Sequence, residues 1–213
     1  MMFENSQVWG FAHALRGMRN PLESWAKSDS SEDGTVIGPN DLDLARRLIS
    51  GGTEHRKFMR QIFISVDITA PLYWWKEFDT YKVGTAANST STMHKLSSRP
   101  ITLDCFETDD LDNTVMDEFG ISAMIDICEK LRVKYLETKD KKYWKELVRW
   151  LPEGWLQTRT VTLNYEIARA VYFQRKNHKL NEWSGNDDNT KDSFIGWIKT
   201  LPYAQELITF EEK

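Results

Sequence analysis

Two polar residues at a helical spacing stand out in the last third of the chain. Asn164 and Arg175 lie 11 positions apart. At 100° per residue their side chains differ by only about 20° around a helix axis, and at 1.5 Å per residue they lie roughly 16 Å apart. Ala168 and Val171 fall between them on that face and are small. We expect this low-relief stripe with polar ends to hold an extended flat ligand such as a nucleotide or a flavin.

The same two residues also have a purely structural interpretation. Asn is a favoured helix N-cap, and a cation near a helix C-terminus is stabilised by the helix dipole. A helix that begins after Asn164 and ends near Arg175 would satisfy both rules without any ligand. From these residues alone, both interpretations stay open.

A hydroxyl-rich run provides the second group of candidate ligand contacts. Short hydroxyl and amide side chains suit hydrogen bonds to phosphate and to uracil-type rings. The alternative is a solvated turn, since the same residue types are common in turns. The run comprises Thr85, Asn88, Ser89, Thr90, Ser91 and Thr92, with Tyr81 and Lys82 before it and His94 and Lys95 after it.

Composition excludes several classes of protein. The 213 residues are 40% hydrophobic and 28% charged, which is typical of a globular chain. The net charge of −4 argues against a duplex nucleic-acid binder that relies on a general basic field. The four His residues show no metal-ligand spacing, and no GxSxG, P-loop or GxGxxG motif is present. We therefore expect no metal site.

The cysteines and the apolar runs indicate in which cellular compartment the protein is expected. Cys105 and Cys128 lack ligand spacing; free thiols in a reducing compartment are the simplest interpretation, and a disulfide pair is the alternative that the sequence leaves open. The N-terminus does not have the pattern of a signal peptide, and no apolar run approaches the length of a membrane helix. These features predict a cytoplasmic protein with no membrane partner.

Periodicity predicts one α+β domain over residues 1–213. The clearest strand alternates Ile62, Ile64, Val66 and Ile68 with polar or larger residues and ends at Ala70-Pro71. Asp41 is expected to cap a short helix that stops at Gly51. Further helices are expected over 8–18, 72–81, 121–137, 141–150, from Asn164 onward and over 194–198, with a β-run over 158–163 and polar loops over 27–41, 104–118 and 184–192.

The order of these pieces resembles the flavin-dependent thymidylate synthases. In that family a strand ending in Ala-Pro leads into an aromatic helix and an Arg-His-Arg-x-x-Ser signature. Here Ala70-Pro71 is followed by Leu-Tyr-Trp-Trp. Pro152 to Asn164 spans 12 positions and Asn164 to Arg175 spans 11, and both spacings are similar to the family's. The resemblance extends from Ile62 to about Trp183 and implies an antiparallel sheet packed with long helices.

The signature itself departs from the family's pattern. Counting from Pro71 places residues 80–85 on it, which keeps Lys82 for an Arg and Thr85 for the Ser. Counting back from Asn88 places residues 81–83 on Arg-His-Arg, and Ser91 on the family's later Ser. Both arginines are missing in either register. A Lys keeps the charge of an Arg but lacks its bidentate fork.

What the resemblance implies is a flavin protein that acts on a nucleotide. The cofactor would be FAD, the ligand a dUMP-like uridylate, and the co-substrates NADPH and methylenetetrahydrofolate, in a homotetramer. Lys82 and Arg149 would face phosphate; for Arg149 a surface Arg on an amphipathic helix is the alternative. By the resemblance Ser91 and Lys82 would be catalytic, Asn164, Arg175, Thr85 and His178 would contact the flavin, and Arg149, Asn88, Tyr81 and His94 would contact the nucleotide.

Three functions are compatible with these residues. The first is a divergent flavin-dependent protein that transfers a one-carbon unit to the pyrimidine of a uridylate. The second is a nucleotide- or flavin-binding module without methylation activity, which the missing arginines favour. The third is an interaction protein with a vestigial pocket that acts through its aromatic residues and its acidic segments 29–43 and 104–118.

Overall fold

The computed structural model describes residues 1–109, 111–112, 114–115, 120–185 and 192–211. By the contacts between its Cα atoms, the chain divides into two compact units. We call them the first unit, which comprises Ile68–Thr80 and Asn88–Arg159 with Met1, and the second unit, which comprises Met2–Asp67, Tyr81–Ala87 and Thr160–Lys213. Most of the expected loop 184–192 and part of the expected loop 104–118 lie outside the described residues.

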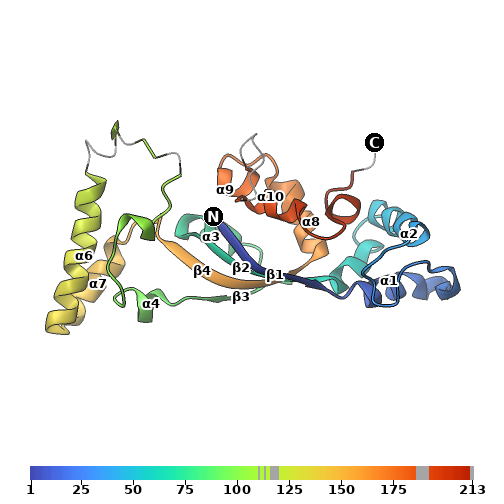
Figure 1. The fold of residues 1–213 in the computed structure, drawn as a ribbon, viewed down its shortest axis with the longest axis horizontal. Helices are drawn as coiled ribbons and strands as arrows, with labels where there is room; N and C mark the ends of the chain where they lie inside the picture. The colour runs from blue at the N-terminus through green and yellow to red at the C-terminus, as the bar shows by residue number, and fades with distance from the viewer. Residues whose placement is uncertain (110, 113, 116–119, 186–191, 212–213) are drawn as a thin grey trace. The chain divides into compact units, whose positions relative to one another are not determined.

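Four strands form an antiparallel sheet in the order β1-β2-β4-β3 (Figure 1). β2 confirms the predicted alternation, because Ile64, Val66 and Ile68 are buried, as is Ile62 just before the strand, while Phe63 is exposed. β4 also confirms the predicted β-run and extends it at both ends. The strands are β1 (Met2–Trp9), β2 (Phe63–Pro71), β3 (Ala86–Ser89) and β4 (Leu156–Asn164).

The first unit contains the long helices that the sequence predicts. α6 (Ile121–Thr138) and α7 (Lys141–Trp150) pack side by side as a helical hairpin, and α3 (Leu72–Phe78), α4 (Thr92–Lys95) and the short η4 (Leu103–Cys105) complete the unit (Figure 1). Two apolar side chains of this hairpin are exposed, Met124 by 46% and Val148 by 40%. The core of this hairpin is formed by Leu96, Ile101, Cys105, Phe106, Cys128, Leu147 and Trp155.

The second unit has an aromatic core beneath its C-terminal helices. Phe194 and Trp197 are buried, and the ring of Phe3 from β1 stacks on Trp197 with centroids 5.2 Å apart. The expected helix over 8–18 is wrong at its start, because Val8 belongs to β1 and the helix begins only after Gly10. The helices are α1 (Phe11–Arg19), η1 (Asn20–Leu22), η2 (Trp25–Lys27), α2 (Pro39–Ser50), η3 (Arg56–Gln61), α8 (Tyr165–Arg175), α9 (Asn181–Ser184), α10 (Phe194–Lys199) and η5 (Ala204–Ile208).

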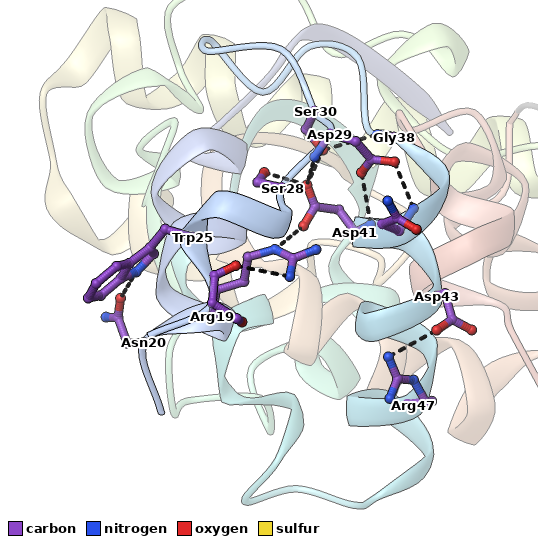
Figure 2. A network of polar contacts seen from close by, with 12 residues as sticks. Arg19, Asn20, Trp25, Ser28, Asp29, Ser30, Gly38, Asp41, Asp43 and Arg47 are labelled. Carbon is purple, nitrogen blue, oxygen red and sulfur yellow. Dashed lines mark hydrogen bonds and ion pairs between the residues drawn. The ribbon is translucent and has the colours of Figure 1, made fainter. Parts of the chain in front are cut away.

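Asp41 does not cap α2 as the sequence predicts. The helix begins two residues earlier, so Asp41 lies in its first turn and its carboxylate is fully buried. Its Oδ1 accepts a 2.6 Å hydrogen bond from Nε of Arg19, and its Oδ2 accepts bonds of 2.6 Å each from the hydroxyls of Ser28 and Ser30 (Figure 2). Burial raises the pKa of the Asp41 carboxyl, but the bonds from Ser28, Ser30 and Arg19 together bring it below its ordinary value.

Two further expectations concern the cysteines and the membrane. Cys105 and Cys128 are both free thiols and both buried, which confirms the prediction of free thiols. Burial raises the pKa of the Cys128 thiol, which packs in the core of the α6–α7 hairpin. Within the described ranges, no helix combines the length and the apolar composition that crossing a bilayer requires.

Candidate functional site

Asn164 acts as the N-cap of α8. Its Oδ1 accepts a 3.0 Å hydrogen bond from the backbone N–H of Ile167, and the helix runs from Tyr165 to Arg175 as the sequence predicts. The structural interpretation of Asn164 is therefore confirmed. The cap uses one of the two acceptor positions of Oδ1.

The stripe between Asn164 and Arg175 is not an open surface. Ala168 and Val171 each expose none of their side chain, and Asn164 itself is only 8% exposed. This face of α8 packs into the core of the second unit, so the interpretation of the stripe as a flat ligand platform is wrong. The physical reason is that small apolar residues at helical spacing are also what close helix packing requires.

Arg175 lies in an aromatic cluster of the second unit. Its Nε donates a 2.8 Å hydrogen bond to the hydroxyl of Tyr81, which in turn donates a 3.0 Å bond to Oε1 of Gln174. The guanidinium carbon is 4.8 Å from the ring centroid of Trp183, a distance typical of a cation–π contact. His178 lies at the edge of the same indole, with ring centroids 6.2 Å apart. The structure thus brings together three predicted site residues, Tyr81, Arg175 and His178.

The loop that carries Lys82 and Thr85 is held tightly against the start of α8. Gly84 has a φ of +74°, and a Cβ at this position would lie 2.4 Å from Cδ1 of Ile167 and 3.5 Å from Nδ2 of Asn164. The hydroxyl of Thr85 donates to the carbonyl oxygen of Tyr81. Lys82 is exposed. The close approach at Gly84 places the degenerate signature beside the Asn164 cap.

In the first unit, part of the hydroxyl-rich run lines a cavity of about 290 Å³. β4 fixes this segment, because the backbone N–H of Thr90 donates to the carbonyl of Thr158 and Nε2 of Gln157 donates to the carbonyl of Thr90, each over 2.8 Å. Ser91 caps α4 by accepting the backbone N–H of His94 at 3.2 Å. The lining residues are Thr90, Ser91, Thr92, Lys95, Leu96, Ser98, Arg99, Trp155, Leu156 and Thr158.

Of the two cations that line this cavity, Lys95 flanks the predicted hydroxyl-rich run, whereas Arg99 was given no ligand role by the sequence analysis. Lys95, the last residue of α4, and Arg99, in the bend that follows the helix, both line it. Arg149, the predicted phosphate contact, is absent from the lining and is half exposed on α7, where its Nη1 is 2.5 Å from Oε1 of Glu146. Asn88 on β3 and His94 on α4 are exposed and also absent from the lining. In the sequence, the signal that could have pointed to these two cations is the spacing Lys-x-x-x-Arg directly after the hydroxyl-rich run.

A second hollow, of about 780 Å³, lies in the second unit. Its walls include Gly17, Asn20, His55, Lys57 and Arg60. None of these residues was predicted as a site residue. In the part of the chain that the structure describes, no three His, Cys, Asp or Glu side chains gather as a metal ion would require.

The fold and these two groups of residues can be compared with known proteins. No family model matches the sequence, and no curated protein matches it either. Solved structures do match: two crystal structures of the flavin-dependent thymidylate synthase ThyX from Helicobacter pylori, each complexed with FAD and dUMP, have TM-scores of 0.70 and 0.71. Both are 16% identical in sequence and cover 98% of this chain, which covers 98% and 97% of theirs.

A related enzyme matches less closely. The UMP/dUMP methylase PolB from Streptomyces cacaoi, bound with 5-Br dUMP, has a TM-score of 0.59 at 12% identity and covers 98% of this chain, which covers 93% of it. At these identities the likeness concerns the fold and not the residues of a site. Over nearly its whole length, this chain has the fold of the flavin-dependent thymidylate synthases, as the resemblance in its sequence implies.

Proposed function

We propose that this chain is a divergent flavin-dependent protein that binds a uridylate-type nucleotide at the cavity beside Ser91. The observation that carries the proposal is the composition of that cavity. Thr90, Ser91 and Thr92 line this space together with Lys95 and Arg99. Hydroxyls and cations at one small cavity are the groups that hydrogen bond a phosphate ester and a pyrimidine carbonyl.

A flavin is the second ligand of the proposal, placed at the Tyr81–Arg175 cluster. The donor set fits a flavin in kind, since a guanidinium, an imidazole, a phenol and an indole lie within one cluster. Arg175 and His178 would hold the cofactor together with Asn164 and Thr85 from the neighbouring loop and cap. Once bound, a flavin supplies hydride transfer. The contribution of this chain is to orient the ring system and to exclude water from it.

The finer parts of the proposal come from the resemblance. They are transfer of a one-carbon unit to the pyrimidine with methylenetetrahydrofolate as donor and NADPH as reductant, a homotetrameric assembly and a cytoplasmic location. The solved structures with this fold contain FAD with dUMP or a brominated dUMP, and these ligands support the same choice of substrates here.

A second candidate function is nucleotide or flavin binding without methylation. A specific observation favours it: Lys82, the one cation left in the signature region, is exposed, and Arg149 is paired with Glu146. Lys82 lacks the bidentate fork with which an arginine fixes a phosphate or polarises a ring, and the guanidinium of Arg149 already pairs with a carboxylate. In this second candidate function the protein binds both the nucleotide and the flavin but does not catalyse methylation.

The first experiment separates these functions by ligand and then by turnover. The purified protein is measured for absorbance between 350 and 500 nm and for melting temperature with added FAD or dUMP. A ligand that binds only the folded state raises the melting temperature. NADPH oxidation with and without dUMP then distinguishes an enzyme from a binder. A colourless protein whose melting temperature neither ligand changes would contradict both candidates.

Charge variants test the placement of the nucleotide. Lys95→Gln and Arg99→Gln should each weaken dUMP binding by roughly tenfold, because each removes a charge-assisted hydrogen bond to phosphate. Lys130→Gln removes the same charge from an exposed residue of α6 that does not line the cavity, and serves as the matched control. If all three variants bind dUMP equally well, the nucleotide is not at this cavity.

A further inference from the structure

A short loop after α4 carries one of the two cations that line the cavity beside Ser91. We name residues 96–101 the Arg99 loop; all of them belong to the first unit. Leu96 and Ile101, at its two ends, are 1% and 2% exposed and belong to the core of the α6–α7 hairpin. Arg99 lies between them, is exposed, and lines the cavity. The core therefore fixes the ends of the loop but not the side chain that meets a ligand.

Two residues of α6 hold the backbone of the Arg99 loop. Oε2 of Glu129 accepts a 2.8 Å hydrogen bond from the backbone N–H of Ile101. Nη1 of Arg132 donates a 3.2 Å hydrogen bond to the carbonyl oxygen of Ser97. Ser97 comes two positions before Arg99, and Ile101 comes two positions after it. The two contacts therefore bracket Arg99 along the chain.

Glu129 and Arg132 are also bonded to each other. Nε of Arg132 donates to Oε2 of Glu129 at 2.7 Å, and Nη2 donates to Oε1 at 2.6 Å, which is a bidentate pair. Every nitrogen of this guanidinium thus has an acceptor, and Arg132 is only 9% exposed. The hydrogen bond from Arg132 lowers the pKa of Glu129, and the same bond raises the pKa of Arg132, so both groups are charged at neutral pH.

The ion pair affects the cavity by geometry rather than by charge. It contains one charge of each sign, and neither residue lines the cavity. Pro100 adds a local restriction, because the residue before a proline is disfavoured in the helical region of backbone conformation. A cation whose backbone is already ordered loses less conformational freedom when it binds an anion. The pair and the proline together therefore prepare Arg99 for a ligand.

We propose that Glu129 and Arg132 are positioning residues of the nucleotide site, whose ion pair holds the Arg99 loop so that the guanidinium of Arg99 meets the phosphate of the nucleotide. This inference rests on the proposed function, since it needs a nucleotide at the cavity beside Ser91. It goes beyond that function because it gives a role to α6, which provides no residue of the cavity lining. The role is indirect, and every effect on the ligand passes through Arg99.

The test measures dUMP binding by isothermal titration calorimetry in the natural chain, in Glu129→Gln, in Arg99→Gln and in the double variant. Glu129→Gln breaks the bidentate pair and leaves the charge of Arg132 without compensation. An uncompensated cation near the cavity would by itself attract a phosphate, so a purely electrostatic role predicts tighter binding. The positioning role predicts the opposite sign, a weakening by roughly fivefold, which disappears when Arg99→Gln is already present.

Two further variants control for charge and for folding. Glu137→Gln makes the same substitution on α6 at a side chain that is 59% exposed and pairs with Lys134, so it should bind dUMP as the natural chain does. Arg132→Lys keeps the charge but lacks the planar fork, so it cannot bond Glu129 twice and Ser97 as well. It should weaken dUMP binding by a factor similar to that of Glu129→Gln. The melting temperature of each variant shows that it remains folded.

The outcomes separate this inference from the proposed function. If the natural chain does not bind dUMP at millimolar concentration, the proposed function fails and the positioning role fails with it. If the natural chain binds dUMP and Glu129→Gln binds it equally or more tightly, only the positioning role is overturned. The same holds if Glu129→Gln weakens binding by an equal factor with and without Arg99→Gln, because the pair then only stabilises the fold. Weakening that requires Arg99, together with normal binding by Glu137→Gln, supports the inference.

Discussion

Two hydroxyl-rich segments of this chain have similar compositions and opposite environments. In the loop between α1 and α2, the hydroxyls of Ser28 and Ser30 both donate to the buried carboxylate of Asp41. In the run before and into α4, the side chains of Thr90, Ser91 and Thr92 line a cavity. The hydroxyls of Ser28 and Ser30 are therefore bonded to a charge of the protein itself, whereas the residues of the second segment line a space large enough for a small ligand.

The comparison shows that hydroxyl content alone does not predict a ligand site. What decides is whether a buried charge lies within reach, because a buried carboxylate must be paired and hydrogen bonded. Asp41 has this requirement, and Arg19, Ser28 and Ser30 meet it (Figure 2). The cavity beside Ser91 has no buried carboxylate in its lining. Of these hydroxyls, that of Ser91 accepts the backbone N–H of His94, and among the described residues its own proton remains for a ligand.

The largest expected effect comes from removing the charge that organises the first segment. Asp41→Ala leaves the buried Arg19 without its partner and should lower the free energy of unfolding by about 3–5 kcal/mol. Chemical denaturation measures the loss. Asp43→Ala, on the same helix with a side chain 70% exposed, should change stability by less than about 1 kcal/mol. Equal losses in the two variants would show that the Asp41 network does not hold the loop.

A smaller effect is expected from acid, because protonation removes the charge of Asp41 but leaves its carboxyl group in place. The folded-state pKa of Asp41 lies below its ordinary value of 3.8, so the unfolded chain binds more protons in this range. The network therefore contributes stability above the unfolded pKa and loses it as the pH falls through the folded one. Between pH 5 and pH 2, the free energy of unfolding should fall more steeply with decreasing pH for the natural chain than for Asp41→Asn. Parallel curves would assign the acid sensitivity to other groups.

Removing one hydroxyl from each segment sharpens the contrast. Ser30→Ala deletes a hydrogen bond to a buried charge and should lower the free energy of unfolding by about 1.5–3 kcal/mol. Nucleotide binding should be unaffected, since Ser30 lies outside the cavity beside Ser91. Thermal denaturation and dUMP titration of the same sample check both halves of this expectation. A stable Ser30→Ala variant would mean that Ser28 and Arg19 suffice for Asp41.

The smallest effect on stability is expected at Ser91, where only an exposed helix cap is lost. Ser91→Ala should lower the free energy of unfolding by about 0.5–1 kcal/mol, because α4 is short and near the surface. Its effect on dUMP affinity should be the larger one, which reverses the pattern of Ser30→Ala. If Ser91→Ala destabilises the protein but binds dUMP normally, the hydroxyl-rich run before α4 has a structural role, as the loop with Ser28 and Ser30 does.

Much of the fold was predictable because it depends on local pattern. The alternation from Ile62 to Ile68 and the bounds of α7 follow from periodicity and end signals alone. β1 was missed because it is an edge strand with mostly exposed residues, and Asn5 interrupts it with a φ of +52°. Exposure removes the apolar signal, and a left-handed residue breaks the period.

The sites were less predictable because they depend on distant contacts. Arg19 and Asp41 are 22 positions apart, and Tyr81 and Arg175 are 94 apart. Local sequence patterns such as helix or strand periodicity therefore do not reveal that either pair is in contact. The prediction that the stripe on α8 is a ligand platform was wrong for another reason. Its spacing correctly placed Ala168 and Val171 on one face, but spacing does not tell whether that face looks toward the core or toward solvent.

The way in which α2 begins has a consequence for the order of folding. Its N-cap residue, Gly38, has no side chain to offer, and the backbone N–H groups of Asn40 and Asp41 are instead bonded by the carboxylate of Asp29 at 2.9 and 3.1 Å. A Cβ on Gly38 would lie 2.3 Å from Cγ of Asp29, so only glycine permits this approach. The first turn of α2 is therefore completed by loop closure rather than by local nucleation. A peptide that begins at Gly38 lacks this cap and should fray at its start.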